Sequence, residues 1–220
     1  MRSIHIISKL ILSNDSLQAK DSNGIFDKIS LQQGSIDGAC SVYSLMMNLL
    51  ILEQISFNDI QVYQKPDDKE TRQLCKRLFE ENGMHHDGQS FYRIQRILNE
   101  SFSNRATCYH PKATHKQAIP LIVNHLKSDL PVIISIEYDK GGAHALLCVG
   151  YEGTEKKVSK LFCLNPSSQK INNCYWNTII DLQPDTNRRK YPYHYITTDF
   201  NIKEDVRLDD ILILTPIESH

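Results

Sequence analysis

The stretch PVIISIEYDKGGAHALLCVGY, residues 131–151, decides the predicted fold class. It holds two runs of β-branched and aliphatic residues joined by a short polar turn, which is typical of neighbouring antiparallel strands. Four runs in the second half of the chain share this character: PVIISIEY (131–138), HALLCVGY (144–151), KLFCLN (160–165) and DDILILTP (209–216). We therefore expect a largely antiparallel sheet there, with an irregular stretch from 167 to 208.

The first half of the chain has a different periodicity. Apolar residues recur at helical spacing in four segments: 39–53, 68–82, 90–102 and 115–127. Because helices gather before strands, the pattern predicts an α+β domain. At 220 residues, with 40% hydrophobic and 23% charged residues, the chain suits one globular domain.

Charge and targeting signals narrow the function classes. The chain has 25 basic and 26 acidic residues, so its net charge of −1 predicts neither a nucleic-acid nor a membrane partner. In the opening MRSIHIISKLILSND, His5, Ser8 and Lys9 interrupt the apolar residues, which favours a first strand over a signal peptide. No run approaches the roughly 18 apolar residues of a membrane span.

Six cysteines are scattered along the chain, and without a secretion signal we expect reduced thiols. The sequence thus predicts a cytoplasmic protein, or one exported by a dedicated secretion system without a cleavable signal. It makes no prediction of an oligomeric state.

Cys40 lies where the polar, glycine-punctuated loop 31–39 runs into the first helical segment. The first turn of a helix has unpaired N–H groups and the positive end of the macrodipole, which stabilise a thiolate. Asp37 and Gly38 offer a capping turn before it. Free cysteine also often only packs in a core, so a purely structural role is the alternative.

Three more residues complete a catalytic pattern around Cys40. Gln33 lies seven positions earlier, where its amide could form an oxyanion hole with the Cys40 N–H. His144 opens a strand after a glycine turn and needs a polar partner, which a thiolate would supply. Asn165 ends the next strand and could orient the imidazole.

The blocks QGSIDGACS, AHALLCVGY and LNPSS resemble those of papain-like cysteine peptidases, nearest the compact bacterial branch with bacteriocin-processing peptidases. This resemblance implies a papain-like cysteine peptidase fold, in which a helical lobe (about 31–130) packs on an antiparallel β-sheet (about 131–216). It implies a cysteine-dependent hydrolase of peptide or amide bonds, with a Cys40–His144–Asn165 triad and a Gln33 oxyanion hole. The partner would be a protein or peptide substrate.

Departures from the family pattern keep alternatives open. The loop is one residue longer before Cys40, so Gln32 is a second candidate for the oxyanion role. Ser41 replaces the aromatic residue that follows the family's nucleophile. From Cys40 to His144 there are 104 residues, fewer than the ~130 typical of papain's close relatives. A glutamine deamidase or transglutaminase with the same residues, or an inactive binding module, are the alternative functions.

Other candidate sites have weaker signals. Four histidines suggest zinc, but no cysteine pair or H-E-x-x-H motif accompanies them: His85, His86, His110 and His115. The segment 188–195 is basic and tyrosine-rich, and we interpret it as a solvated loop pinned by tyrosines rather than a nucleic-acid contact or the rim of a substrate groove. No phosphate-binding glycine motif occurs, so we expect neither a cofactor nor a metal.

Overall fold

The computed structural model describes residues 1–13, 16–20, 26–34, 38–61, 66–80, 89–154, 157–168, 173–183, 190–197 and 202–217. Its elements, in chain order, are β1 Ser3–Ile6, β2 Leu10–Ser13, β3 Ser16–Lys20, β4 Phe26–Lys28, α1 Cys40–Ile51, the 3₁₀ turn η1 Phe57–Ile60, α2 Lys69–Cys75, the π-helical turn η2 Lys76–Glu80, α3 Phe91–Ser101, β5 Ala106–Tyr109, α4 His115–Lys127, β6 Val132–Tyr138, β7 Ala143–Gly153, β8 Val158–Leu164, β9 Thr178–Asp181, β10 Tyr193–Thr197 and β11 Lys203–Pro216.

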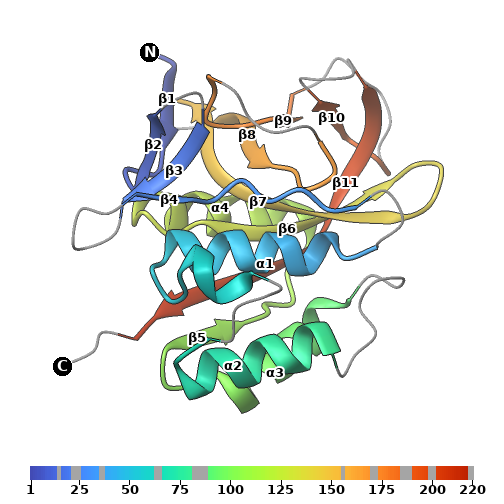
Figure 1. The fold of residues 1–220 in the computed structure, drawn as a ribbon. Coiled ribbons are helices and arrows are strands. Elements are labelled where there is room, and N and C mark those ends of the chain that lie inside the picture. The colour runs from blue at the N-terminus through green and yellow to red at the C-terminus, as the bar shows by residue number, and fades with distance from the viewer. Residues whose placement is uncertain are drawn as a thin grey trace.

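Six strands close into an antiparallel barrel. They follow the order β7-β6-β11-β10-β9-β8, and pairing of β8 with β7 completes the ring. β1 adds to the side of β7, and β5 pairs with the far end of β11, which extends beyond the barrel (Figure 1). The strands β2, β3 and β4 form a small separate sheet.

The long strand β7 is the junction of this architecture. It pairs with β6 through 143–148, with β8 from Leu147 onward and with β1 through 150–153. At Gly150 the β1 strand comes so close that an added Cβ would lie 2.5 Å from the backbone oxygen of His5. A glycine is therefore required where β1 pairs with β7 at this position.

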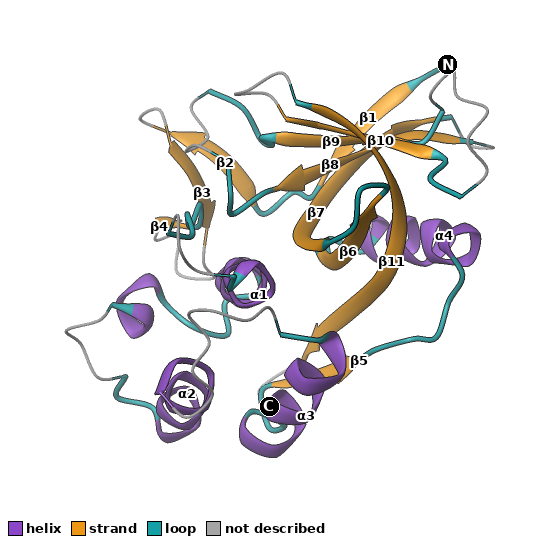
Figure 2. Cartoon of the chain, turned by 90° about the vertical axis from the view of Figure 1, so that its right-hand side faces the viewer, coloured by secondary structure: helices purple, strands orange, loops and turns teal. Residues whose placement is uncertain are grey.

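The helices are distributed around the barrel (Figures 1 and 2). α1 packs against β6 and β7, and α4 packs against β11, β7 and β6. α2 and α3 pack on each other, and α3 covers β5 and the extended part of β11. Ten of the twelve residues of α1 are buried, so this helix is part of the main core.

The predicted fold class, an α+β papain-like fold with a helical lobe packed on an antiparallel β-sheet, is wrong. The chain is mostly β, and its second-half strands close into a barrel. Four strands precede α1, where only a first strand was predicted, and β5 lies between two helices. These strands have three to five residues, too few for a period to show, and β9 and β10 lie inside the stretch predicted to be irregular.

Many individual elements are confirmed nevertheless. α1, α3 and α4 coincide with the predicted helices within two residues, and the four predicted strands correspond to β6, β7, β8 and the end of β11. The helix predicted over 68–82 ends as α2 at Cys75 and continues as η2. All strand pairs in the described residues are antiparallel, as expected. None of the helices in these residues has the length and apolar character needed to span a bilayer.

Candidate active site

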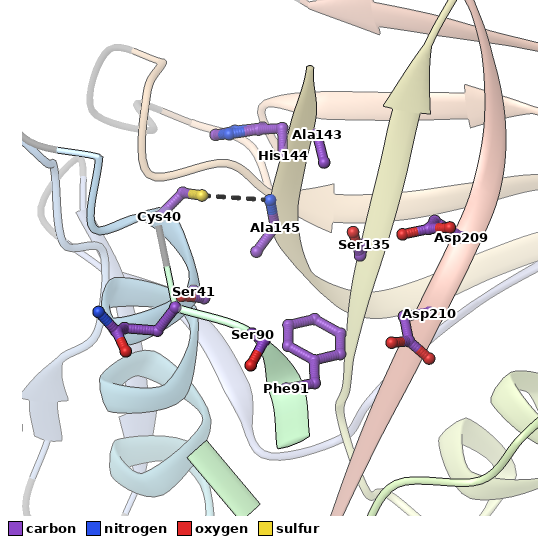
Figure 3. Close-up of a pocket in the computed structure, with 11 residues that line it drawn as sticks. Cys40, Ser41, Ser90, Phe91, Ser135, Ala143, His144, Ala145, Asp209 and Asp210 are labelled. Carbon is purple, nitrogen blue, oxygen red and sulfur yellow. Dashed lines mark hydrogen bonds between the residues drawn. The ribbon is translucent and has the colours of Figure 1, made fainter. Parts of the chain in front are cut away.

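Cys40 is the first residue of α1 and is half-buried. The residue before the helix is Ala39, which has no side-chain cap, while the expected cap Asp37 lies outside the described residues. The Cys40 Sγ accepts a hydrogen bond from the backbone N–H of Ala145 at 3.3 Å (Figure 3). An N–H donor and a helix N-terminus both stabilise a sulfur that carries negative charge.

The backbone of Ala145 joins α1 to β7 at two atoms. Its N–H contacts Cys40, and its carbonyl oxygen accepts a hydrogen bond from the buried Ser44 hydroxyl at 3.3 Å. Pairing of β7 with β8 begins only at Leu147, so at Ala145 this edge of β7 is open to the helix. Because buried backbone groups need partners, these contacts fix Cys40 beside β7.

His144 is the second residue of β7 and precedes Ala145. The turn before it has Gly141 and Gly142 at φ values of 91° and 90°, and Tyr138 donates to the Gly142 oxygen at 3.1 Å. Glycine adopts these positive φ values without strain. This turn starts β7 so that His144 is half-buried on the side where Cys40 lies (Figure 3).

Asn165 follows the end of β8 and contacts His144 directly. Its Oδ1 lies 2.7 Å from the His144 Nε2, and its Nδ2 donates to the Tyr195 hydroxyl at 2.7 Å and to the Ser168 hydroxyl at 3.0 Å. With both amide hydrogens committed to these hydroxyls, the network assigns the oxygen to the imidazole side. His144 therefore donates through Nε2, and its Nδ1 is free to act as a base.

A second asparagine holds the backbone of Asn165. Asn177 accepts from the Asn165 N–H at 2.7 Å and donates to the Asn165 carbonyl oxygen at 3.0 Å. Both asparagines are buried. The orienting residue is thus fixed at its side chain and at its main chain, which a strand end alone would not achieve.

Burial shifts the pKa of His144 and the pKa values of two thiols that lie away from the site. Burial lowers the pKa of His144, and the hydrogen bond to Asn165 partly offsets this effect. A neutral imidazole is therefore favoured at rest, as a general base requires. Burial raises the pKa of Cys75 to about 11 and that of Cys108 to about 12. Those two thiols remain protonated, in agreement with packing roles.

Gln33 reaches the site through its backbone. Its N–H donates to the Pro166 oxygen at 2.9 Å, so the loop lies against the turn that follows Asn165. The Gln33 side-chain oxygen is buried, whereas Gln32 is exposed, which favours Gln33 of the two glutamines. Residues 35–37 lie outside the described residues, and the oxyanion role of Gln33 stays a prediction.

A cavity of about 340 Å³ opens beside Cys40 (Figure 3). Its lining comes from α1, the start of α3 and three barrel strands: Cys40, Ser41, Gln89, Ser90, Phe91, Ser135, Ala143, His144, Ala145, Asp209 and Asp210. Sequence reasoning missed its two aspartates and the roles of Tyr195 and Asn177, which contact Asn165. Pairing of the barrel strands brings the aspartates to the cavity and Tyr195 to Asn165, so no local motif could reveal these contacts.

The other candidate sites receive little support. Within the described ranges no group of three potential ligands could hold a metal. His110 instead pairs with Asp210 at 2.6 Å, and His115 lies edge-on to the Tyr193 ring. His85, His86 and the two arginines at 188 and 189 lie outside the described residues. Tyr193 and Tyr195 are buried in β10, a strand where we expected a loop.

Sequence comparison with known proteins gives no information about the site. The sequence matches no family model. It matches none of the curated proteins. The residues around Cys40 and their contacts are therefore the evidence for function.

Proposed function

We propose that this protein is a cysteine-dependent hydrolase of peptide or amide bonds, with Cys40 as nucleophile, His144 as acid and base, and Asn165 as orienting residue. One observation carries the proposal. The Asn165 Oδ1 lies 2.7 Å from the His144 Nε2, and the next residue along β7, Ala145, donates its N–H to the Cys40 Sγ. A thiol, an imidazole and an orienting amide in this order form the triad of nucleophilic catalysis.

The first step is proton transfer from Cys40 to His144. Burial keeps the imidazole neutral before substrate binds, so its Nδ1 can accept the thiol proton. The Ala145 N–H and the N-terminus of α1 then stabilise the thiolate. The Asn165 Oδ1 stabilises the resulting imidazolium through Nε2 without adding a charge to the site.

Acyl transfer follows from the same atoms. The Cys40 thiolate attacks the carbonyl carbon, and the Cys40 N–H and the Gln33 amide stabilise the oxyanion. His144 gives its proton to the leaving amine as the carbon–nitrogen bond breaks, which leaves a thioester on Cys40. His144 then takes a proton from water, which attacks the thioester and releases the acid and the thiol.

The resemblance of the sequence blocks to papain-like cysteine peptidases supports this chemistry and favours a peptide substrate. A glutamine side chain would react by the same steps, which would make the enzyme a deamidase or, with an amine acceptor, a transglutaminase.

All six cysteines are free thiols. We accordingly propose that the protein works in the cytoplasm, or after export without a cleavable signal.

The experiment is mass spectrometry of candidate protein and peptide substrates after incubation with the wild type and with Cys40→Ala. Proteolysis splits the chain, whereas deamidation adds about one mass unit to it. The proposal expects one of these changes with the wild type and neither with Cys40→Ala. A product that forms equally well with both proteins would refute the proposal.

A further inference from the structure

Strand pairing brings Asp210 into the wall of the cavity that opens beside Cys40. Ala145 on β7 pairs with Ser135 on β6, and Ser135 pairs with Asp210 on β11. Residues directly opposite in antiparallel strands point to the same face. All three line the cavity. With strands about 4.8 Å apart, the Asp210 backbone lies about 10 Å from that of Ala145, which contacts the Cys40 sulfur.

A β-bulge in β11 adds a second aspartate, Asp209, to this wall. The pairing of β11 with β6 shifts between Leu208 and Asp210, which leaves Asp209 as an extra residue. Such a bulge re-aims a side chain that normal alternation would send to the other face. Asp209 and Asp210 consequently both line the cavity, with Ser135 between them and Ala145 (Figure 3).

The nearby cations do not neutralise both carboxylates. Arg207 pairs with Glu137, donating from Nε at 2.9 Å and also from Nη2, and its guanidinium reaches Asp209 only at 3.9 Å. His110 contacts Asp210 at 2.6 Å and carries a charge only when protonated. Burial and the neighbouring Asp210 raise the pKa of Asp209, as expected where negative charge is incompletely balanced.

A buried hydroxyl in the same cavity supports a polar ligand. Ser41 follows Cys40 on α1, is 2% exposed and lines the cavity. Its Oγ has no hydrogen-bond partner among the described residues. Buried polar atoms normally have partners, and those that lack one call for an explanation. A bound donor group entering beside Cys40 would supply it.

The cavity also has an apolar part. The ring of Phe91 forms one wall, and Ala143 and Ala145 add methyl groups. Its volume of about 340 Å³ lies at the small end of the range for ligand pockets. A lysine or arginine side chain matches this layout because it combines an apolar stem with a cationic head.

We propose that Asp209 and Asp210 select substrates with a lysine or arginine side chain beside the bond that Cys40 attacks. The inference rests on the proposed function for its link to catalysis. The apolar stem would pack on Phe91, and the cationic head would reach the two carboxylates. Glutamate at the same substrate position would be rejected, because it would bring a third negative charge to this wall.

The test measures binding separately from catalysis. Fluorescein-labelled tripeptides with lysine, norleucine or glutamate at each position are titrated into Cys40→Ala by fluorescence polarisation. At the best position we expect lysine to bind about tenfold or more tightly than norleucine, since a charge-assisted hydrogen bond stabilises only lysine. Asp209→Asn and Asp210→Asn should each reduce this preference. Asp67→Asn, which removes an exposed charge outside the cavity, should leave it unchanged.

Two results would overturn the inference: equal binding of lysine and norleucine peptides at every position, or a lysine preference that survives in the Asp209→Asn/Asp210→Asn double variant. The first comparison uses one folded protein, so it does not depend on how the aspartate variants fold. Cleavage and glutamine deamidation by the wild type are measured in parallel on candidate protein and peptide substrates. Lysine-selective binding without either reaction would contradict the proposed function and leave the charge selectivity standing.

Discussion

Removal of one buried hydroxyl tests how the candidate triad is held in place. Tyr195→Phe keeps the ring in β10 but removes the acceptor of the 2.7 Å hydrogen bond from the Asn165 Nδ2. Both residues are buried, at 5% and 3% exposed, so water cannot readily replace the lost partner. An unsatisfied buried donor costs about 1 to 3 kcal/mol, and we expect the free energy of unfolding to fall by that amount.

Tyr195→Phe should lower kcat without abolishing activity. The Asn165 amide keeps its hydrogen bond to Ser168, and its Oδ1 still faces His144. If looser orientation raises the barrier by about 1.4 kcal/mol, kcat falls about tenfold. We expect a drop of this size with little change in KM, because Tyr195 does not line the cavity.

Two matched variants serve as controls, with stability measured by urea unfolding and turnover measured on one peptide substrate. Tyr193→Phe removes a hydroxyl from the same strand in a similarly buried place. Tyr138→Phe removes a hydroxyl that is hydrogen-bonded to Tyr195 and leaves the hydrogen bond from Asn165 to Tyr195 in place. A Tyr195→Phe variant that loses no more stability than Tyr193→Phe and keeps its kcat would refute the role of Tyr195 as the support of Asn165.

Three further predictions concern the pair and its oxyanion hole. Iodoacetamide at neutral pH should alkylate Cys40 much faster than Cys108, whose pKa is raised to about 12, and equal rates found by peptide mapping would contradict a nucleophilic role. Because the pKa of His144 is lowered from 6.5, the unfolded chain gains this proton first as pH falls; the free energy of unfolding should therefore decline below about pH 6.5, and less so in His144→Gln, by urea unfolding across pH. Gln33→Ala should reduce kcat about 10²-fold to 10³-fold with little effect on binding, and a severe loss in Gln32→Ala alone would move the oxyanion role to that residue.

The sequence contained enough information to predict the long helices and strands. α4 follows the predicted bounds because its apolar period runs through three turns, and β6 and β7 follow theirs because long aliphatic runs flank a glycine turn. The predicted fold class was wrong partly because it missed β9 and β10, which are short and separated by polar residues. They are stabilised by pairing with β8, with each other and with β11.

The candidate site shows the same division between local and distant information. Cys40, His144 and Asn165 stand at element ends that the sequence marks, and the hydrogen bond from His144 to Asn165 is present in the structure. Tyr195 is 30 residues from Asn165, and Asp210 reaches the cavity only through the register of β11 with β6. Residues recruited by pairing of distant strands have no local signal, so sequence reasoning could not name them.

The most direct test of the central claim is to trap the acyl-enzyme. The wild type is mixed with an activated peptide ester, quenched in acid within the first turnover, and analysed by intact mass and by peptide mapping. The proposed mechanism predicts one added acyl group, attached as a thioester to Cys40, and its absence in Cys40→Ala. Turnover that persists in Cys40→Ala, or an acyl group attached to another residue, would contradict Cys40 as the nucleophile.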